Sequence, residues 1–402
     1  MLALRVFAPF AFGYFLSYLF RSINAVIAPD LAQEVSLDAA TLGLLSSAYF
    51  FTFAVFQFPL GILLDRYGPR RTEAVLLIFA AVGSALFAIS TTFNGLFIGR
   101  ALIGLGVSAC LMAAFKAYVM WFPKERLPFV NGCQMAAGGL GALSATLPVQ
   151  VLLSLTDWRG IFIGLAIITV VSALIVLLVV PEKDEPASGQ TLSEQIASFF
   201  EILRSPAFLR LAPLTVCVQS MFIAVQSLWS GPWLYDVAGL GRAAVAEHLF
   251  MIAASMVAGF LVLGTAAERL SRIGIKPIAV NVFGVIMFMG VQGILVLQWQ
   301  SAILAQWMVF GFFGATSILS YAILSQNFAK EFAGRVNAGL NLLLFTASFF
   351  VQWGIGAIIN LWPATNTGQY AAEGYQAAFA ALLVLQVIAL IWFAFYRRIK
   401  FI

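Results

Sequence analysis

The stretch GILLDRYGPRRT, residues 61–72, marks the place where a long apolar segment ends, and it decides the fold. Asp65 interrupts the apolar run, and three bases follow within six positions: Arg66, Arg70 and Arg71. Gly68 lies between them, where it permits a tight turn. Basic residues at the end of an apolar helix are typical of an anchor at the anionic inner leaflet of a membrane.

The composition on either side of this turn is that of a membrane protein. Of the 402 residues, 62% are hydrophobic and 10% are charged, against about 25% charged in an ordinary soluble domain. Six charge-free windows can each cross a hydrocarbon core, which takes about 20 helical residues: 39–64, 127–156, 160–181, 211–235, 248–267 and 374–396. A longer window, 277–329, is interrupted at residues 298–301 and holds two spans. We predict an all-α protein with twelve transmembrane helices.

The basic residues predict the orientation of these helices. With twelve spans, 17 of the 22 Lys and Arg residues fall on the side of the two termini. The positive-inside rule then places both termini in the cytoplasm. We expect the protein in a bacterial inner membrane. The same bias explains the net charge of +5, so no nucleic-acid partner is expected. The first apolar segment, from about Val6 to Pro29, is too long for a cleaved signal.

One hydrophilic stretch divides the chain. Residues 181–206 separate two predicted six-helix bundles, 1–180 and 207–402, and we expect a cytoplasmic linker there. Within it, apolar residues follow helical spacing after a capping box formed by Thr191 and Glu194. The members of this predicted surface helix are Leu192, Ile196, Phe199, Phe200 and Leu203.

The second half repeats the charged turn of the first. GTAAERLSRIG, residues 264–274, has Gly264, then Glu268 and Arg269, then a further glycine, in the order of Gly61, Asp65, Arg66 and Gly68. Two parallel six-helix repeats are the architecture of one class of secondary transporters.

With these residues the sequence resembles the major facilitator superfamily. GILLDRYGPRR is similar to the family signature between helices 2 and 3. GRALIGLG, residues 99–106, is similar to a second signature in helix 4 through Arg100, Gly104 and Gly106. The resemblance implies transport by alternating access. In helix 5, residues 138–148 lack the Gly-Pro pair of drug and proton antiporters, which argues against an exporter of lipophilic compounds.

The charged turn is expected to bias the two conformations of such a transporter. Asp65 is an acid where an orientation signal would use only bases, and in this fold it faces the amino end of helix 11, around residues 334–337. An interaction of about 1.4 kcal/mol changes the population ratio of two states tenfold. The gating group comprises Gly61, Asp65, Arg66, Gly68, Arg70, Arg100, Gly264, Glu268 and Arg269.

A polar stripe in helix 1 predicts the substrate site. Tyr14, Ser17, Tyr18, Arg21 and Asn24 recur at three- and four-residue spacing and share one helical face. Arg21 stands nine residues before Asp30, or about 13 Å, so it should face a cavity or a partner. All acids, Glu73 included, are assigned to loops or span ends. Buried bases without a buried acid favour an anionic guest.

The same segment resembles the organophosphate and phosphate antiporter branch of the family. The resemblance implies substrate binding by Arg21 and a basic residue at Lys116. The second arginine of that branch is missing from helix 7, residues 221–233, so a monocarboxylate or another weakly charged organic anion fits better. Two alternatives stay open: Arg100 can bind backbone carbonyl groups of helix 1, and Lys116 can anchor at the membrane surface.

Six further polar or aromatic residues are candidate ligands: Gln134, Gln226, Trp229, Tyr321, Asn341 and Gln352. Interhelical hydrogen bonds are the alternative for each of the polar ones. A break in helix 7 is expected at Gly231 and Pro232.

Other classes of function are disfavoured. The three cysteines fall inside spans, and His248 with nearby methionines makes a poor copper site, so no metal or cofactor is expected. No nucleophile, base and orienting group occur together, which disfavours an enzyme. A solute sensor and a lipophilic exporter remain alternatives to an anion transporter. Coupling to protons stays open, and we expect a monomer.

Overall fold

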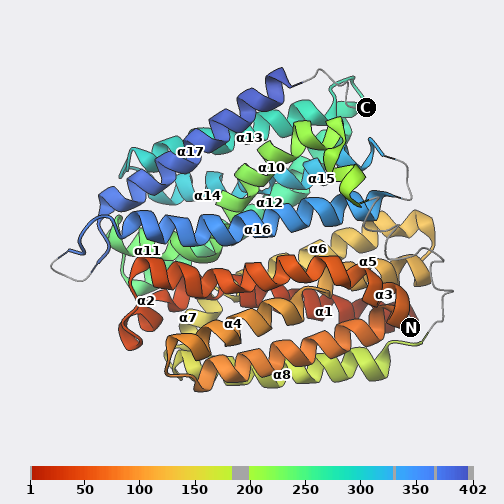
Figure 1. Cartoon of the computed structure of the whole chain (residues 1–402), viewed down its shortest axis with the longest axis horizontal. Coiled ribbons are helices and arrows are strands. Elements are labelled where there is room, and N and C mark those ends of the chain that lie inside the picture. Colours follow the sequence, from red (N-terminus) through yellow and green to blue (C-terminus); the bar gives the residue numbers. More distant parts are fainter. Residues whose placement is uncertain (1, 183–198, 329–331, 366–368, 397–402) are drawn as a thin grey trace. The chain divides into compact units, whose positions relative to one another are not determined.

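The computed structural model describes residues 2–182, 199–328, 332–365 and 369–396, and every regular element in these ranges is a helix (Figure 1). Ten of the helices are long and apolar enough to cross a membrane, or eleven if α1 (Leu2–Ser22) and α2 (Asn24–Glu34) are counted as one bent span. The predicted all-helical membrane class is therefore confirmed.

Helix α3 (Ala39–Ile89) contains the charged turn. Its 51 residues would extend about 75 Å, more than twice the hydrocarbon thickness of about 30 Å. The helix is interrupted at Gly68, whose φ of 75° and ψ of 166° lie in a region that is essentially restricted to glycine. The predicted turn at Gly68 is present, and it joins two helical segments.

The chain folds into two compact units. The first comprises Met1–Leu37 and Leu44–Gly189, and the second comprises Asp38–Gly43 and Gln190–Ile402. Most of the predicted linker lies outside the described residues, including its capping box. Residues 199–204, the described end of the predicted surface helix, are helical.

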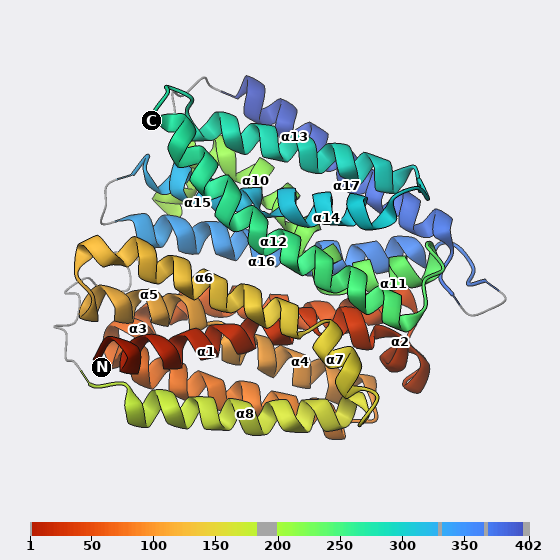
Figure 2. The ribbon, with the colours of Figure 1, turned by 180° about the vertical axis from the view of Figure 1, so that it is seen from behind.

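The first unit contains α1, α2, α3 from Leu44 onward, and α4 to α8. After α3 come α4 (Phe93–Val107), α5 (Cys110–Trp121), a short 3-10 turn, α6 (Leu127–Ser144), α7 (Leu147–Leu152) and α8 (Trp158–Val179). Helix α1 packs mainly on α6, and also on α5 and α8 (Figure 2). Helix α1 is therefore a central helix of the first unit.

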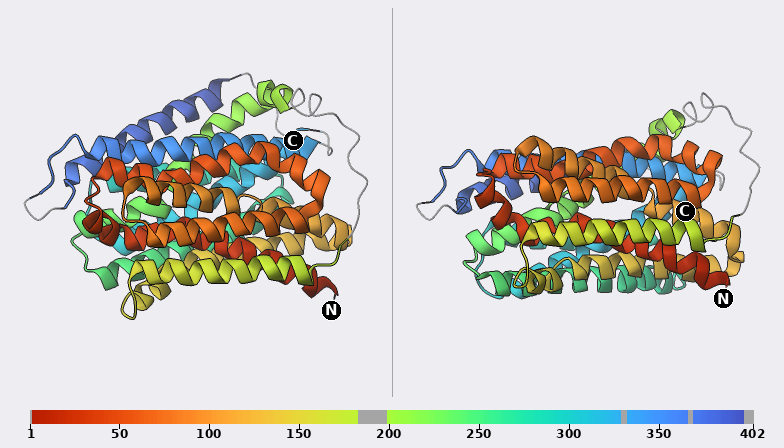
Figure 3. Two further views of the ribbon diagram at one scale, coloured as in Figure 1. Left: turned by 60° about the horizontal axis from the view of Figure 1, so that its bottom comes forward. Right: turned by 90° about the horizontal axis from the view of Figure 1, so that it is seen from below.

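Helix α8 runs beside α3 within the first unit (Figure 3). Ser84 donates to the carbonyl oxygen of Phe162 at 2.7 Å, and Arg70 donates twice to the carbonyl oxygen of Leu177, at 2.8 and 2.6 Å. Leu177 lies in the last turn of α8, where carbonyl groups lack partners within the helix. Arg70 of the charged turn thus caps α8.

The second unit contains α10 (Pro206–Ala224), a π-helical turn (Val225–Trp229), α11 (Ser230–Asp236), α12 (Arg242–Ser271), α13 (Pro277–Val296), α14 (Ile303–Gly314), a 3-10 turn (Ala315–Ser317), α15 (Ile318–Ser325), α16 (Ala333–Ile359) and α17 (Ala372–Phe395). Helix α10 packs on α16 and α17, and α12 packs on α14. The pairing of α10 with α16 parallels that of α1 with α6 in the first unit.

The seventh predicted span, formed by α10, the π-helical turn and α11, is irregular slightly before the break predicted at Gly231 and Pro232. The π-helical turn ends at Trp229, three residues before Pro232. Proline has no N–H and its ring clashes with the carbonyl group four residues earlier, here that of Leu228, so the helix widens there. The expected break is thus a local widening in front of Gly231 and Pro232.

Candidate functional site

The polar stripe of α1 is mostly buried. Tyr14, Ser17, Arg21 and Asn24 are exposed by at most 7%, and Tyr18 is half-buried. The rings of Tyr14 and Tyr18 meet edge to face at 5.1 Å, and the Tyr14 hydroxyl lies 3.7 Å from Met135 Sδ. These residues therefore share one face, as their spacing predicts.

Aromatic groups surround Arg21. Its Cζ lies 4.4 Å from the ring centroid of Tyr18 and 5.8 Å from that of Phe53, and it also hydrogen-bonds the Tyr49 hydroxyl. Tyr49 in turn donates to the carbonyl oxygen of Ser17 at 3.1 Å. A guanidinium over an aromatic face gains about 0.5 to 2 kcal/mol, which helps to hold Arg21 in place.

Arg100 supports the bend between α1 and α2. Its Nη1 donates to the carbonyl oxygen of Phe20 at 2.9 Å, close to the end of α1, and its Cζ lies 5.4 Å from the Tyr49 ring centroid. The two helices meet at a bend of 45°. The structure therefore favours the backbone-binding alternative for Arg100, which has no acidic partner in the described parts of the chain.

Asn24 lies just past the bend. Its Nδ2 donates to Ser46 Oγ at 2.8 Å, while its Oδ1 is buried without a hydrogen-bond partner. One polar atom of Asn24 is therefore still available to a ligand.

Lys116 is separated from this group. Its Nζ lies 2.6 Å from Asp65 Oδ1, at the charged turn. The pair borders a cavity of about 100 Å³ that is also lined by Arg66, Arg70 and Glu182. Arg70 and Arg71 both form ion pairs with Glu182. The structure thus joins Lys116 to the gating group and not to Arg21.

Both polar atoms of the Gln134 side chain form hydrogen bonds to neighbouring helices. It accepts from the Tyr118 hydroxyl at 2.7 Å, and its Nε2 lies 3.2 Å from the Phe10 carbonyl oxygen and 3.5 Å from that of Cys110. Since α1, α5 and α6 are joined through this amide, Gln134 has a structural role in this state.

The candidates of the second unit form two hydrogen-bonded groups, the first buried and the second, with Tyr321, partly buried. Trp229 Nε1 donates to the Gln352 carbonyl oxygen at 2.9 Å, and Ser227 donates to Gln352 Oε1 at 3.0 Å. Tyr321 donates to Asn341 Oδ1 at 2.5 Å. Gln226 is 7% exposed and lies in the π-helical turn. Both groups hold neighbouring helices together, as the interhelical alternative expects.

The second charged turn differs from the first in its pairing. Glu268 binds Arg272 of the same helix at 2.7 Å, and both side chains are largely exposed. Gly274 has a φ of 90°, comparable with Gly68, whereas a Cβ at Gly61 or Gly264 would meet nothing within 4 Å. Within the described residues, no neighbour thus packs closely on Gly61.

Two features escaped the sequence prediction, and Glu73 is the first. The sequence places it at a span end, and it does lie only five residues after the break at Gly68, but its side chain is 0% exposed and enclosed by α1 and α5. The expectation of buried bases without a buried acid is therefore wrong. Glu73 follows the charged turn closely in sequence, so only the packing of two other helices shows its burial.

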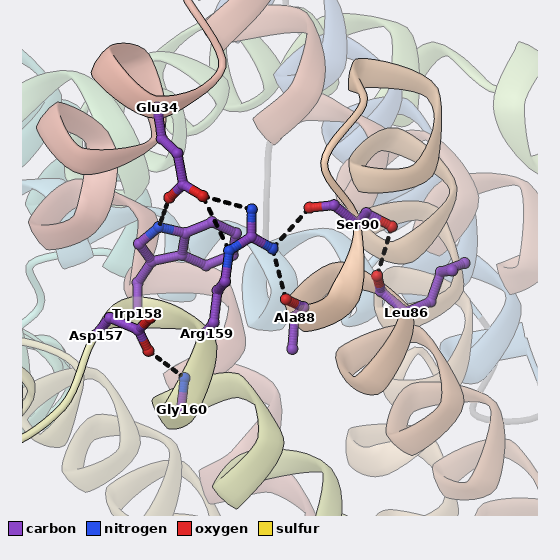
Figure 4. Close-up of polar contacts among 8 residues, drawn as sticks. All are labelled: Glu34, Leu86, Ala88, Ser90, Asp157, Trp158, Arg159 and Gly160. Carbon is purple, nitrogen blue, oxygen red and sulfur yellow. Dashed lines mark hydrogen bonds and ion pairs between the residues drawn. The ribbon is translucent and has the colours of Figure 1, made fainter.

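The second feature is a clamp at the opposite end of the first unit (Figure 4). Arg159 donates to Glu34 at 2.6 and 3.0 Å and to the carbonyl oxygens of Ala88 and Ser90 at 2.6 and 2.7 Å. Trp158 Nε1 donates to the other Glu34 oxygen at 2.7 Å. The clamp joins the ends of α2 and α3 to the start of α8.

No group of three or more potential metal ligands occurs in the described ranges. The Nδ1 of His248 lies 2.8 Å from the carbonyl oxygen of Ala244, one helical turn earlier.

Comparisons with known proteins extend these observations. The family model described as "Major Facilitator Superfamily" matches residues 10–352. The "Hexuronate transporter" of Bacillus subtilis is 24% identical over 396 residues, which are 93% of this chain and 92% of that protein. The "Probable sulfoacetate transporter SauU" of Cupriavidus necator is 27% identical over 184 residues. That alignment covers 45% of this chain and less than half, 43%, of the relative.

A solved structure shows the same fold. A bacterial homolog of the human lysosomal transporter Spinster, in an inward-facing and occupied conformation, gives a TM-score of 0.78 at 18% identity. The superposition covers 98% of this chain and 96% of that protein.

Proposed function

Because the chain belongs to the Major Facilitator Superfamily, we propose that it moves a small organic anion across the bacterial inner membrane by alternating access. The chain is an integral multi-pass membrane protein and a secondary transporter, not an enzyme. The class of substrate, the membrane and the transport mode are the proposed elements.

The observation that carries the proposal is a pair of buried guanidinium groups that meet at Tyr49. Arg21 and Arg100 are 7% and 1% exposed, and both contact this tyrosine. Arg100 is occupied by the α1 backbone, whereas Arg21 belongs to a face that also presents Tyr14, Tyr18 and Asn24. A guanidinium with nearby hydroxyl and amide groups suits a carboxylate, which accepts paired hydrogen bonds.

The names of the relatives also support a negatively charged substrate. The names of the two relatives reported above refer to hexuronate and sulfoacetate, both of which are organic acids. Since the hexuronate transporter aligns over nearly its whole length, a sugar acid or a similar carboxylate is the first substrate class to test.

We further propose twelve crossings, with α3 counted as two, arranged as bundles 1–180 and 207–402 with both termini in the cytoplasm. The Lys and Arg distribution supports this orientation. We also propose that the transporter works as a monomer.

A thermal-shift screen tests the substrate class. The purified protein is heated with D-glucuronate, sulfoacetate, inorganic phosphate or a lipophilic amine. A ligand at 100 times its Kd stabilises the folded state by about 2.7 kcal/mol. We expect an organic carboxylate to stabilise the wild type, Arg21→Lys to weaken this effect and Arg21→Ala to remove it. Arg272→Gln, which alters an exposed base, is the matched control.

The alternatives give different results in the same screen. Stabilisation by the amine alone would favour an exporter of lipophilic compounds. A carboxylate that stabilises wild type and Arg21→Ala equally would exclude Arg21 from the site. Counterflow of the stabilising ligand in liposomes separates a transporter from a sensor, which binds without flux.

A further inference from the structure

Glu73 is a buried acid without a hydrogen-bonded counterpart. Its side chain is 0% exposed, and neither carboxyl oxygen has a partner that meets hydrogen-bond geometry. Among the Asp and Glu residues that the structure describes, none shares this condition. An ionised carboxylate in such a place costs several kcal/mol even after relaxation. The carboxyl group therefore holds a proton in this conformation.

Helices α1 and α5 enclose the group. A Cβ placed on Gly13 of α1 would lie 2.3 Å from Glu73 Oε1 and 3.7 Å from the Cys110 sulfur of α5. The Cys110 thiol is a weak donor that faces the carboxyl group. Tyr118 of α5 is also near, but its hydroxyl is committed to Gln134. Neither thiol nor phenol supplies the positive charge that an ionised carboxylate requires.

The bases of the surrounding helices are engaged elsewhere. On α3, Arg70 binds the end of α8 and Arg71 binds Glu182. On α5, Lys116 binds Asp65. On α1, Arg5 is exposed, and Arg21 stands eight residues beyond Gly13, about 12 Å along the helix. On α6, Cys133 interacts with Tyr118. No base in the described residues around Glu73 is paired with it.

Helix α1 links this group to the anion site. The residue that covers the carboxyl group, Gly13, precedes Tyr14 of the polar stripe, and the same uninterrupted helix extends to Arg21. A helix moves as a rigid element, so a displacement of α1 that admits or releases an anion also changes the cover over Glu73. Acids inside membrane segments typically serve as proton relays in transporters.

We propose that Glu73 is the proton-binding group that couples anion movement to a pH gradient, an inference that rests on the proposed function. In one conformation a carboxylate oxygen takes a proton from water and an O–H bond forms. In the other conformation that bond breaks, and the proton leaves to water on the opposite side. One proton with one monoanion moves no net charge, so the pH gradient and not the membrane potential drives uptake.

Two transport assays in liposomes test the proposal. D-Glucuronate uptake is driven by an imposed pH gradient in one assay and by counterflow, without a gradient, in the other. We expect Glu73→Gln to keep counterflow. Its gradient-driven accumulation should be at least tenfold lower than that of the wild type. Glu373→Gln, which removes an exposed carboxylate at the start of α17, is the control and keeps both activities.

The outcomes separate the two proposals. Gradient-driven accumulation by Glu73→Gln at the wild-type level would overturn the role of Glu73. Wild-type counterflow without gradient-driven uptake would also overturn it, while leaving anion transport intact. If no acid of the panel (D-glucuronate, sulfoacetate and phosphate) is moved at all, the proposed function fails first.

An infrared measurement tests the protonation of Glu73 without any substrate. The infrared carbonyl stretch of a protonated carboxylic acid is followed in the reconstituted wild type as pH is raised. We expect a band that disappears with rising pH and is missing from Glu73→Gln. A band that never titrates would identify a permanently protonated structural acid and overturn the proposal. If Glu73→Gln does not fold, Glu73→Asp keeps the acid and should shift the pH at which the band disappears.

Discussion

Three buried or half-buried arginines in the first unit are held by backbone carbonyl groups. Arg100 donates to Phe20 near the end of α1, Arg70 to Leu177 near the end of α8, and Arg159 to Ala88 and Ser90 at the end of α3. Carbonyl groups at helix ends lack partners within the helix, and a guanidinium can satisfy two at once. These arginines therefore fix helix ends and bends.

The Glu34–Arg159 pair offers a measurement of this effect. We expect Glu34→Gln and Arg159→Gln each to destabilise the protein, with a coupling of about 1 kcal/mol in the double mutant, since Arg159 is only 19% exposed. Chemical unfolding in detergent gives the free energies. The exposed pair Glu268 and Arg272 is the reference, with an expected coupling of about 0.3 to 0.5 kcal/mol. Equal coupling in both pairs would show that the clamp adds nothing beyond a surface ion pair.

At the scale of elements, three interruptions of the membrane helices can be traced to particular residues. Gly68 separates the two segments of α3, and Pro232 precedes a widened turn in helix 7. The bend at Ile23 has neither glycine nor proline, and there the guanidinium of Arg100 binds the nearby backbone.

The two glycines of the charged turn should respond oppositely to alanine. Gly68→Ala must adopt a backbone conformation that costs of the order of 1 to 3 kcal/mol. Gly61→Ala is helical with open space around its Cβ, so it should gain about 0.8 to 1.0 kcal/mol. Thermal unfolding of both variants gives the comparison. If Gly61→Ala is stable but fails to transport, Gly61 packs closely in another conformation of the cycle. Wild-type stability of Gly68→Ala would contradict the backbone assignment.

The start of α3 predicts a pH effect. Asp38 accepts from the Thr41 N–H at 2.8 Å and from its hydroxyl at 2.6 Å. Partial burial opposes ionisation, but these hydrogen bonds outweigh it and hold the pKa of Asp38 below its ordinary value of 3.8. Such a group contributes stability above its unfolded pKa and loses it as pH falls through the folded pKa. Asp38→Ala should cost about 0.5 to 2 kcal/mol at neutral pH.

The measurement is the thermal midpoint of wild type and Asp38→Ala from pH 7 down to about pH 3, below the unfolded pKa of about 3.9. The difference between them should shrink only at the acidic end. A difference that stays constant over this range would show that the carboxylate charge plays no part in the cap.

At the scale of the whole molecule, the charged turn links stability to the transport cycle. Asp65 and Lys116 pair within the first unit, while the family resemblance implies that Asp65 also biases the two conformations. The two roles can be separated, because only the first depends on Lys116.

Cysteine accessibility from the cytoplasmic side gives the separation. If Asp65 acts only through Lys116, Asp65→Asn, Lys116→Met and the double variant should raise accessibility equally. If Asp65 also acts as a latch, Asp65→Asn should exceed Lys116→Met, and a latch of about 1.4 kcal/mol would change the population ratio about tenfold. Unchanged accessibility in all three variants with normal expression would remove the gating role of this pair.

The sequence by itself determined the helical membrane class, the family signature, the turn at Gly68 and the shared face of Tyr14, Arg21 and Asn24. Each of these depends on neighbours within one segment: a long apolar run, a fixed spacing, or a backbone conformation open to glycine. Tertiary structure decided the partners of Lys116, Arg100 and Gln134, and it buried Glu73 beneath Gly13. A side chain's burial and partners depend on which other helices pack against it, and the spacing of residues along its own helix does not contain that information.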